Sequence, residues 1–275
     1  MRRYSRFWRW MDRVTAILVL AAMICACPPA RAEGVEPPPE ETPAPQPIED
    51  ALPLIRINPD TVGWLQVGRI IDMPVVQRDN DYYLHHNFLG ESVYAGTVFL
   101  DEECSILPRD EHLVLYGHNM RNGSVFGELD RYRDLKYLKA NPIVSFDTIY
   151  EEGLYAVIAV FDISAETEDP DYLEMLTFNF EEDEFAEFME EVRERSFYVI
   201  PVDIRHGDHL LTLVTCSYTL YDGRLILMLR EIRDDEDPQE IAEAMQSTVR
   251  QQPKIPSKMQ TEAPEEETEE APEDE

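Results

Sequence analysis

The chain has 275 residues, of which 44% are hydrophobic, so it is long enough to bury a substantial core. It carries 24 basic and 56 acidic residues, a formal net charge of −32, and such a surface should repel the phosphates of nucleic acid. The charge therefore argues against nucleic-acid binding. Part of the acid lies in a C-terminal run, residues 262–275, so the folded part is less acidic than the total suggests.

The N-terminus has the layout of an export signal. Five arginines, Arg2, Arg3, Arg6, Arg9 and Arg13, precede an apolar run over residues 14–27. We expect residues 1–27 to anchor the chain in the membrane and the rest to lie on its extracytoplasmic face. The apolar run is shorter than the roughly 20 residues that span a bilayer, and Ala30-Arg31-Ala32 resembles a cleavage site. Cleavage and secretion is therefore the alternative.

Composition divides the rest of the chain into four parts. Residues 28–49 are rich in proline and glutamate and predict a solvated linker. Residues 50–233 form the main domain. Residues 234–252 predict a C-terminal helix with Asp237 as N-cap, Pro238 at its first position, and Ile241, Met245 and Val249 on one side. Residues 253–275 predict an acidic disordered tail.

The main domain reads as all-β with helical insertions. Short runs rich in β-branched and aromatic residues, bounded by Gly, Pro, Asp or Asn, predict strands at 75–76, 96–100, 112–116, 143–146, 154–161, 198–202, 210–215 and 225–230. Their number and spacing favour a barrel or sandwich. One insertion is helical, because apolar side chains recur at spacings of three and four between Phe180 and Val192, among glutamates.

Two of the predicted strands lead to residues that could form a nucleophile and its partner. Residues 210–215 lead to Cys216, and residues 113–117 lead to His118. A thiol with an ordinary pKa needs a base or cationic neighbour, and its leaving group needs a proton donor. Arg224 follows, and its planar donors suit an oxyanion. Taken singly, each has a more ordinary interpretation: a buried small hydrophobe, a loop hydrogen-bond partner and a solvated strand end.

The joint pattern resembles the sortase family. Thr212-Leu213-Val214-Thr215-Cys216 is similar to the TLxTC motif of sortases, Tyr116-Gly117-His118-Asn119-Met120 is similar to their histidine loop, and Arg224 falls where their arginine lies. Segments 58–64, 79–84, 96–101 and 126–129 resemble class B sequences in particular. The resemblance covers roughly residues 50–233, which makes this part the predicted sortase catalytic domain. The linker, the last helix and the tail lie outside it.

This resemblance implies an eight-stranded β-barrel and a two-step transpeptidation. Cys216 would attack a threonine carbonyl in a C-terminal sorting signal, and His118 would protonate the departing amine. Arg224 would steady the oxyanion, with Thr215 as a second donor. The partners would be surface proteins or pilins that carry the signal, and an amine of a peptidoglycan precursor or pilin. No cofactor or metal is implied. The helical insertion would help form the signal-binding groove.

One local pattern conflicts with this assignment. Asp222-Gly223 is typical of a tight two-residue hairpin. Regular pairing around that turn would put Cys216 opposite Leu229 and leave its thiol some 16 Å from Arg224 along the ladder. The family pattern instead ends the strand near Cys216 and makes residues 217–223 a wide loop. We adopt the wide loop because the three-part motif is the more specific signal.

Other side chains are weaker candidates for chemistry. The acidic neighbours of Cys104, Asp101 to Glu103, should raise its thiol pKa, so it is predicted to be a loop residue. The remaining histidines, His85, His86, His112, His206 and His209, lack metal-ligand spacing and are predicted to be solvated or structural. We therefore expect neither a second reactive thiol nor a metal site.

Two other functions compete with a sortase. The first is a cysteine endopeptidase or hydrolase of the cell envelope, but papain-like enzymes place the cysteine before the histidine, the reverse of the order here. Caspase-like enzymes place the histidine first, yet Ser217-Tyr218 does not match their local signature. The second is a non-catalytic barrel scaffold, which the intact cysteine, histidine and arginine set disfavours.

Overall fold

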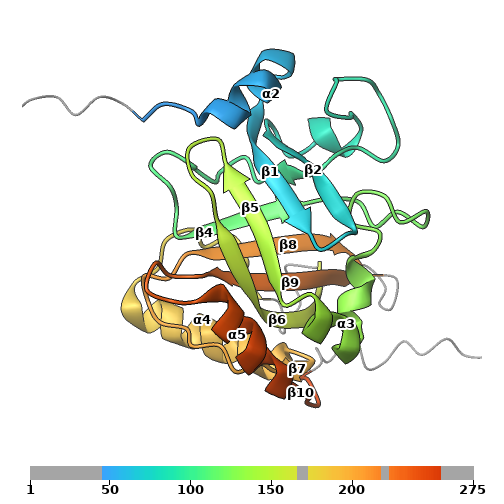
Figure 1. The fold of residues 1–275 in the computed structure, drawn as a ribbon. Coiled ribbons are helices and arrows are strands. Elements are labelled where there is room, and N and C mark those ends of the chain that lie inside the picture. The colour runs from blue at the N-terminus through green and yellow to red at the C-terminus, as the bar shows by residue number, and fades with distance from the viewer. Residues whose placement is uncertain (1–44, 166–172, 218–222, 255–275) are drawn as a thin grey trace, which may run out of the picture. The chain divides into compact units, whose positions relative to one another are not determined.

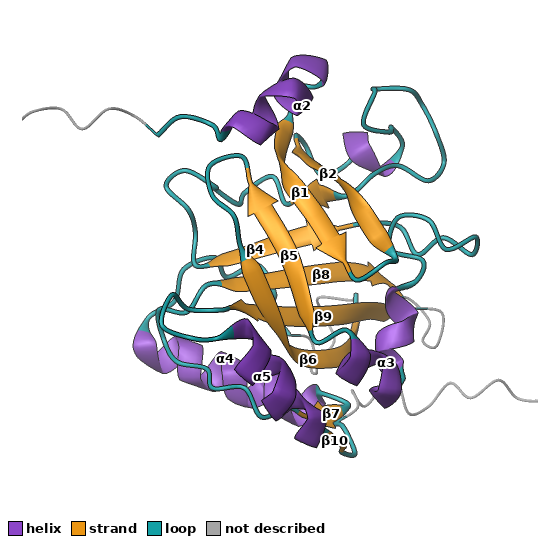
Figure 2. Cartoon of the chain, viewed as in Figure 1, coloured by secondary structure: helices purple, strands orange, loops and turns teal. Residues whose placement is uncertain are grey.

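A closed β-barrel dominates the computed structural model of the protein, which describes residues 45–165, 173–217 and 223–254 (Figures 1 and 2). Within these residues eight strands pair around the barrel in the order β1 (Thr61–Val67), β2 (Ile71–Gln77), β3 (Phe99–Leu100), β4 (His112–Tyr116), β8 (Leu210–Cys216), β9 (Gly223–Glu231), β6 (Leu154–Ser164) and β5 (Ile143–Thr148). The β2–β3 and β4–β8 pairs are parallel and the other pairs are antiparallel. The predicted all-β fold and eight-stranded barrel are confirmed.

The membership of the barrel differs from the prediction at one strand. Of residues 198–202, only β7 (Tyr198–Val199) is a strand, and it pairs with β10 (Val249–Arg250) outside the barrel. The eighth strand of the barrel is instead β1, which was not predicted. The alternation typical of a strand is present in β1, since Leu65 and Val67 are buried while the residue between them is exposed. In the sequence, however, Gly63 obscures this alternation. A Cβ at Gly63 would lie 2.3 Å from the carbonyl oxygen of Asp147, so the close approach of β5 requires glycine.

Helices and single helical turns connect the strands. They are η1 (Glu49–Ala51), α2 (Leu52–Ile57), η2 (Tyr82–Leu84), η3 (Leu129–Arg133), α3 (Leu135–Ala140), α4 (Glu182–Arg195), α5 (Pro238–Ala244) and η4 (Met245–Ser247). The helix α4 confirms the predicted insertion. Glu181 and Glu184 form a capping box at its start, and Phe185, Phe188 and Val192 are buried on one side.

The C-terminal helix is shorter than predicted. Its start is confirmed, because the Asp237 carboxylate accepts a hydrogen bond from Gln239 N at 2.8 Å and Pro238 is the first helical residue. The helix ends at Ala244, however, and Val249 lies in β10 opposite Val199 instead of on a helical face. The β-branched side chains at 248 and 249 disfavour helix, and strand pairing with β7 satisfies the backbone there.

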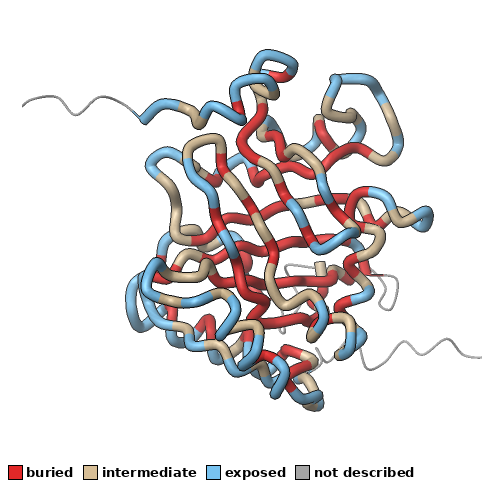
Figure 3. The backbone as a smooth tube through the Cα atoms, viewed as in Figure 1, coloured by how far each residue is buried: buried red, intermediate tan, exposed pale blue. Residues whose placement is uncertain are grey.

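Burial on both faces makes one side of the barrel rigid. The strands β6, β8 and β9 are buried along almost their whole length (Figure 3). Their inner faces contribute to the barrel core, and the helices α4 and α5 pack on β6 from outside. Strands buried on both faces are apolar throughout, as residues 210–214 are apart from one threonine. A side chain at the end of β8 is therefore held by a well-packed strand.

The predicted N-terminal anchor (residues 1–27) and most of the linker and acidic tail lie outside the described residues. Within the described ranges, no helix is both long enough and apolar enough to cross a membrane. The chain is already packed on the barrel two residues before the predicted domain start at Asp50, because Ile48 N donates to Ile149 O at 2.8 Å.

Candidate active site

Two parallel strands bring His118 level with Cys216. The strands β4 and β8 pair in register up to Tyr116 opposite Val214. His118 lies two residues beyond Tyr116, and Cys216 lies two residues beyond Val214. Parallel strands end at the same edge of a sheet, so the imidazole and the thiol lie at the same edge of the barrel although they are far apart in the sequence.

An antiparallel strand adds Arg224 at the same edge. Cys216 and Arg224 are direct partners in the β8–β9 pair. Ser217 N donates to Gly223 O at 2.8 Å, which makes Cys216–Arg224 a non-hydrogen-bonded pair with both side chains on one face. The tight turn that would have placed Leu229 opposite Cys216 is excluded by this register. The predicted wide connection after Ser217 is confirmed, although residues 218–222 themselves lie outside the described residues.

A pocket of about 370 Å³ opens at this edge. It is lined by Asn80, Leu84, Phe99, Tyr116, Gly117, His118, Val214, Thr215, Cys216 and Arg224. All four residues that the sequence predicts for the site therefore border one cavity. Small-molecule and peptide sites are commonly concave, apolar and bordered by a few polar groups, and this lining has that character.

The side chain of Cys216 is exposed at the end of an otherwise buried strand. Its backbone carbonyl accepts a hydrogen bond from Asn119 Nδ2 at 2.7 Å, and the same amide nitrogen lies 3.1 Å from Asp130 Oδ2. Asn119 thus ties the residue after His118 to the backbone of Cys216. Sequence reasoning gave Asn119 no role. Its only signal was its position within the Tyr116–Met120 motif.

The hydrogen bonding of His118 assigns its tautomer. His118 Nε2 lies 3.1 Å from the carbonyl oxygen of Leu84. A carbonyl oxygen only accepts, so Nε2 carries the proton, and in neutral His118 the lone pair lies on Nδ1. The nitrogen that can take up or release a proton during a reaction is therefore Nδ1. Tyr94 lies parallel to the same imidazole, with ring centroids 6.0 Å apart and planes inclined by 7°.

The hydroxyl of Thr215 serves the fold. Thr215 is buried, and its Oγ1 donates to the carbonyl oxygen of Gly117 at 2.7 Å. This bond fixes the residue before His118 against β8. The hydroxyl proton is directed at that carbonyl and is not available to an oxyanion in this conformation. Support of an oxyanion by Thr215 therefore stays a prediction, and it would need a rotated hydroxyl or another donor group of Thr215.

A partly buried charge network supports the end of β8. Arg133 forms a bidentate pair with Asp162 at 2.6 and 2.7 Å, and its Nη2 lies 3.1 Å from Ser217 Oγ. Arg133 Nε also contacts Asp130, the carboxylate that holds Asn119. This arginine is absent from the predicted site, because Asp162 and Ser217 come from two distant segments and no local pattern connects them with it.

The other predicted side chains take no part in the pocket. Cys104 is buried, and burial together with the charges of Asp101 and Asp110 raises its pKa to about 12. We expected acidic neighbours to be the main cause, whereas desolvation is the larger one. His112 is buried between Thr212 Oγ1 and the carbonyl oxygen of Thr177, at 2.8 and 2.9 Å.

Three further histidines also have structural partners. His86 bonds to the carbonyl oxygen of Tyr82, His206 to that of Phe180, and His209 to the carboxylate of Glu231. Across the described ranges, no group of three or more His, Cys, Asp or Glu side chains is arranged to hold a metal.

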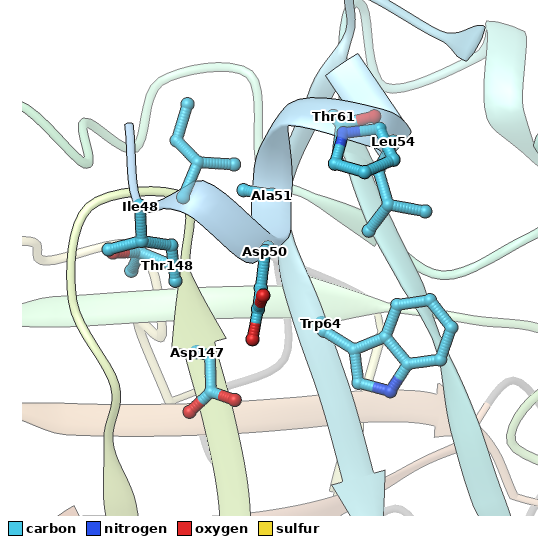
Figure 4. A pocket seen from close by; sticks show the side chains of 11 residues that line it. Ile48, Asp50, Ala51, Leu54, Thr61, Trp64, Asp147 and Thr148 are labelled. Atoms are coloured by element: carbon cyan, nitrogen blue, oxygen red, sulfur yellow. The ribbon is translucent and has the colours of Figure 1, made fainter. Parts of the chain in front are cut away.

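A second cavity, of about 360 Å³, lies beside α2, β1 and β5 (Figure 4). It is bordered by Trp64 and Leu54, with the carboxylates of Asp50 and Asp147 nearby. Among the described residues that line it there is neither a thiol nor an imidazole. It therefore offers no nucleophile and base, and the chemistry belongs at the edge that carries Cys216. No residue of α4 lines the Cys216 pocket in the described part of the chain, so this helix does not form a wall of it.

Sequence and structure comparisons lead to the same family. The chain is 37% identical over 167 residues to sortase B of Listeria monocytogenes, which covers 60% of this chain and 65% of that protein. It is 28% identical over 185 residues to sortase B of Staphylococcus aureus, covering 66% and 73%. The X-ray structure of Clostridium perfringens sortase B aligns with a TM-score of 0.61 and 31% identity over 66% of this chain and 99% of that one. The chain belongs to the class B sortases.

Class B sortases are cysteine transpeptidases, and the predicted family is thereby confirmed. No family model matches the chain. The match to the Listeria sortase spans slightly less than two thirds of that protein.

Proposed function

We propose that this class B sortase cleaves a C-terminal sorting signal after threonine and transfers the new carboxyl end to an amine. Cys216 is the nucleophile, His118 the acid and base, and Arg224 the oxyanion donor. The observation that carries the proposal is the meeting of these three residues around one pocket at the ends of β4, β8 and β9. A nucleophile, a proton carrier and a rigid cationic donor are what acyl transfer through a thioester needs.

The first step forms the acyl-enzyme. The Cys216 thiolate attacks the threonine carbonyl carbon, and the carbonyl oxygen becomes an oxyanion. The oxyanion then collapses, the C–N bond breaks, and imidazolium His118 gives its Nδ1 proton to the departing amine. A thioester and neutral His118 remain. The exposure of Cys216 allows attack, while the packed strand behind it limits the motion that would misplace the sulfur.

The second step resolves the thioester. A neutral amine attacks the thioester carbon, the C–S bond breaks, and a new amide forms as the attacking nitrogen loses its proton. The Cys216 thiolate is regenerated. Neutral His118 accepts a proton from the incoming amine, so the imidazolium is regenerated as well. One residue thus serves as acid and then as base in successive steps.

Arg224 is the donor for the oxyanion in both steps. It is half-buried, borders the pocket and faces Cys216 across the sheet. Its Nη1 also donates to the carbonyl oxygen of Gly223 at 3.1 Å, which helps to orient the guanidinium. A positioned donor of this kind contributes roughly 10²–10³ in rate in other acyl transferases.

The substrates are surface proteins or pilins with a sorting signal, and the acceptor is an amine of a peptidoglycan precursor or of a pilin. Among proteins of the same fold, a Staphylococcus aureus sortase B has been solved as a substrate complex and a sortase B has been solved in complex with triglycine. These two share only 24% identity with this chain. They nevertheless suggest triglycine as a practical acceptor for a first assay.

The protein acts on the extracytoplasmic face of the membrane and is held there by residues 1–27. This part of the proposal rests on the sequence alone, on the arginines that precede the apolar run. The N-terminal sequence of the mature protein, read by mass spectrometry of membrane and culture fractions, tests it. A mature chain that starts just after Ala32 in the culture medium would support cleavage and secretion instead.

A product analysis separates this function from its rivals. Threonine-containing peptides are incubated with the protein, with and without triglycine, and the products are identified by mass spectrometry. A sortase gives a peptide joined through threonine to triglycine. A cysteine hydrolase of the envelope gives the same free carboxylate with or without the amine. A scaffold gives no product with any peptide, and that outcome would contradict the proposed function.

A further inference from the structure

An exposed aromatic ring lies beside the imidazole of His118. Tyr94 is 82% exposed, more than any other large hydrophobic side chain that the structure describes. Its ring is parallel to that of His118, at a centroid distance of 6.0 Å. The ring therefore gains little from burial, and it stands largely open to solvent beside the histidine that lines the Cys216 pocket.

The backbone on both sides of Tyr94 is fixed. Val93 N donates to His85 O at 2.9 Å, and Gly96 N donates to Val93 O at 3.3 Å, which closes a turn around Tyr94. Gly96 has a φ of +59°, and a Cβ there would lie 2.4 Å from the carbonyl oxygen of Tyr83. The turn therefore has one conformation that its sequence favours, and the exposure of the ring follows from the fold.

The segment that carries Tyr94 reaches His118 at two points. Leu84, at its start, accepts the hydrogen bond from His118 Nε2, and Tyr94 lies along the ring. The first contact occupies Nε2 and leaves Nδ1 as the nitrogen that can receive a proton. The second places a largely exposed aromatic ring beside the imidazole that receives a proton from the acceptor amine.

We propose that Tyr94 determines specificity for the acceptor by binding it as an ammonium ion. This rests on the proposed transpeptidation. Amines with pKa values of about 8 to 10 are mostly protonated at neutral pH, and the face of a tyrosine ring attracts cations. The formal charge of −32 further favours a cationic acceptor over an anionic one.

The proton transfers of the second step explain how binding of an ammonium ion at Tyr94 would assist the reaction. The bound ammonium loses one proton to water and becomes a nucleophile. As it attacks the thioester and the C–S bond breaks, the nitrogen gives its second proton to Nδ1 of neutral His118. The products are an amide, the Cys216 thiolate, imidazolium His118 and one released proton. An ammonium bound to the exposed ring of Tyr94 lies beside the imidazole that serves as its base.

Binding of an amine in the absence of turnover tests the proposal directly. Triglycine is titrated into the full chain carrying Cys216→Ala, with the His118 ring signals followed by NMR. Adding Tyr94→Leu should weaken the dissociation constant about fivefold, the fold-change that corresponds to about 1 kcal/mol. Tyr94→Phe keeps the ring face and should retain most of the affinity. Leu89→Ala alters another exposed side chain of the same loop and is the matched control.

Kinetics in the active protein separate acceptor binding from positioning of His118. Relative to the wild type, Tyr94→Leu should raise the KM for triglycine by a larger factor than it lowers the rate of peptide cleavage. The proposal would be overturned if the Cys216→Ala protein bound triglycine equally well with and without Tyr94→Leu. It would also be overturned if Tyr94→Leu reduced the rates of cleavage and of transfer by the same factor in the active protein. A wild-type protein that never cleaves peptide would instead contradict the proposed function, while the titration would still decide the role of Tyr94.

Discussion

Cys216 and Arg224 face each other across β8 and β9, at the last residue of one strand and the second residue of the other. In a non-hydrogen-bonded antiparallel pair the Cβ atoms lie about 4.5–5.5 Å apart. The register of the sheet therefore sets the separation of nucleophile and donor. The parallel register of β4 and β8 does the same for His118. The registers of three neighbouring strands thus set the relative positions of the three residues.

Replacement of Arg224 by lysine should reduce kcat/KM about as much as replacement by alanine, by a factor of 10² or more. One ammonium on a flexible stem cannot reproduce the planar fork opposite Cys216. Steady-state peptide cleavage measures the effect. Arg193→Lys, at an exposed position on α4, is the matched control. A fully active Arg224→Lys protein would remove the guanidinium from the mechanism.

Iodoacetamide should label Cys216 far faster than Cys104 in the folded protein. Burial is the main cause that raises the pKa of Cys104 to about 12, so only about one thiol in 10⁴ is ionised there at pH 8. Cys216 is exposed at the pocket. Peptide mapping by mass spectrometry gives both rates, and labelling of Cys216 should abolish cleavage. Comparable labelling of the two thiols before unfolding would contradict the described burial.

Asn119→Ala should lower kcat/KM by roughly 10- to 100-fold with a smaller effect on peptide affinity. The variant loses the donor that joins the histidine segment to the carbonyl of Cys216, and small displacements of reacting groups reduce rates strongly. Asn119→Asp should be at least as poor, since its carboxylate would face both that carbonyl and Asp130. Wild-type turnover in both variants would show that the bond has no part in positioning.

Stability should decrease as the pH falls below about 6.5 because of His112. Burial lowers the pKa of this histidine from 6.5 to about 4 in the folded state. The unfolded state therefore binds the proton first, so the stability is complete above pH 6.5 and is lost progressively toward pH 4. The loss is about 3 kcal/mol in free energy of unfolding.

Urea unfolding of wild type and His112→Gln at several pH values tests this effect. The variant should be less stable at pH 7, because it loses the packing of the imidazole between Thr177 and Thr212, but its stability should fall less between pH 6.5 and 4. Parallel pH dependence in the two proteins would mean that His112 does not titrate in this range.

Much of this site could be predicted from sequence because its three main residues lie in short motifs at strand ends. His118 and Cys216 each follow an apolar run, and the parallel register of β4 and β8 brings the ends of these two runs together. Arg133 could not be predicted, because its contacts with Asp162 and Ser217 depend on tertiary packing. Tyr94 was missed for a similar reason, since nothing local marks an exposed tyrosine as the neighbour of an imidazole.

The fold shows the same division. Strands with uninterrupted apolar runs, such as β4 and β8, were predicted nearly residue for residue. The strand β1 was missed, because a glycine that tertiary contact with β5 requires reads locally as a strand breaker. The pair β7 and β10 needs both partners, so neither segment could be assigned from its own sequence.

The most direct test of the mechanism is the covalent state of Cys216 during turnover. The protein is mixed with a cleavable threonine peptide without amine, quenched in acid, and analysed by intact-mass and peptide-mapping mass spectrometry. We expect a thioester on the peptide that contains Cys216, its transfer to triglycine on addition of the amine, and neither adduct nor cleavage in a folded Cys216→Ala protein. Cleavage by Cys216→Ala above about a tenth of the wild-type rate, or an acyl group on another residue, would contradict the assignment.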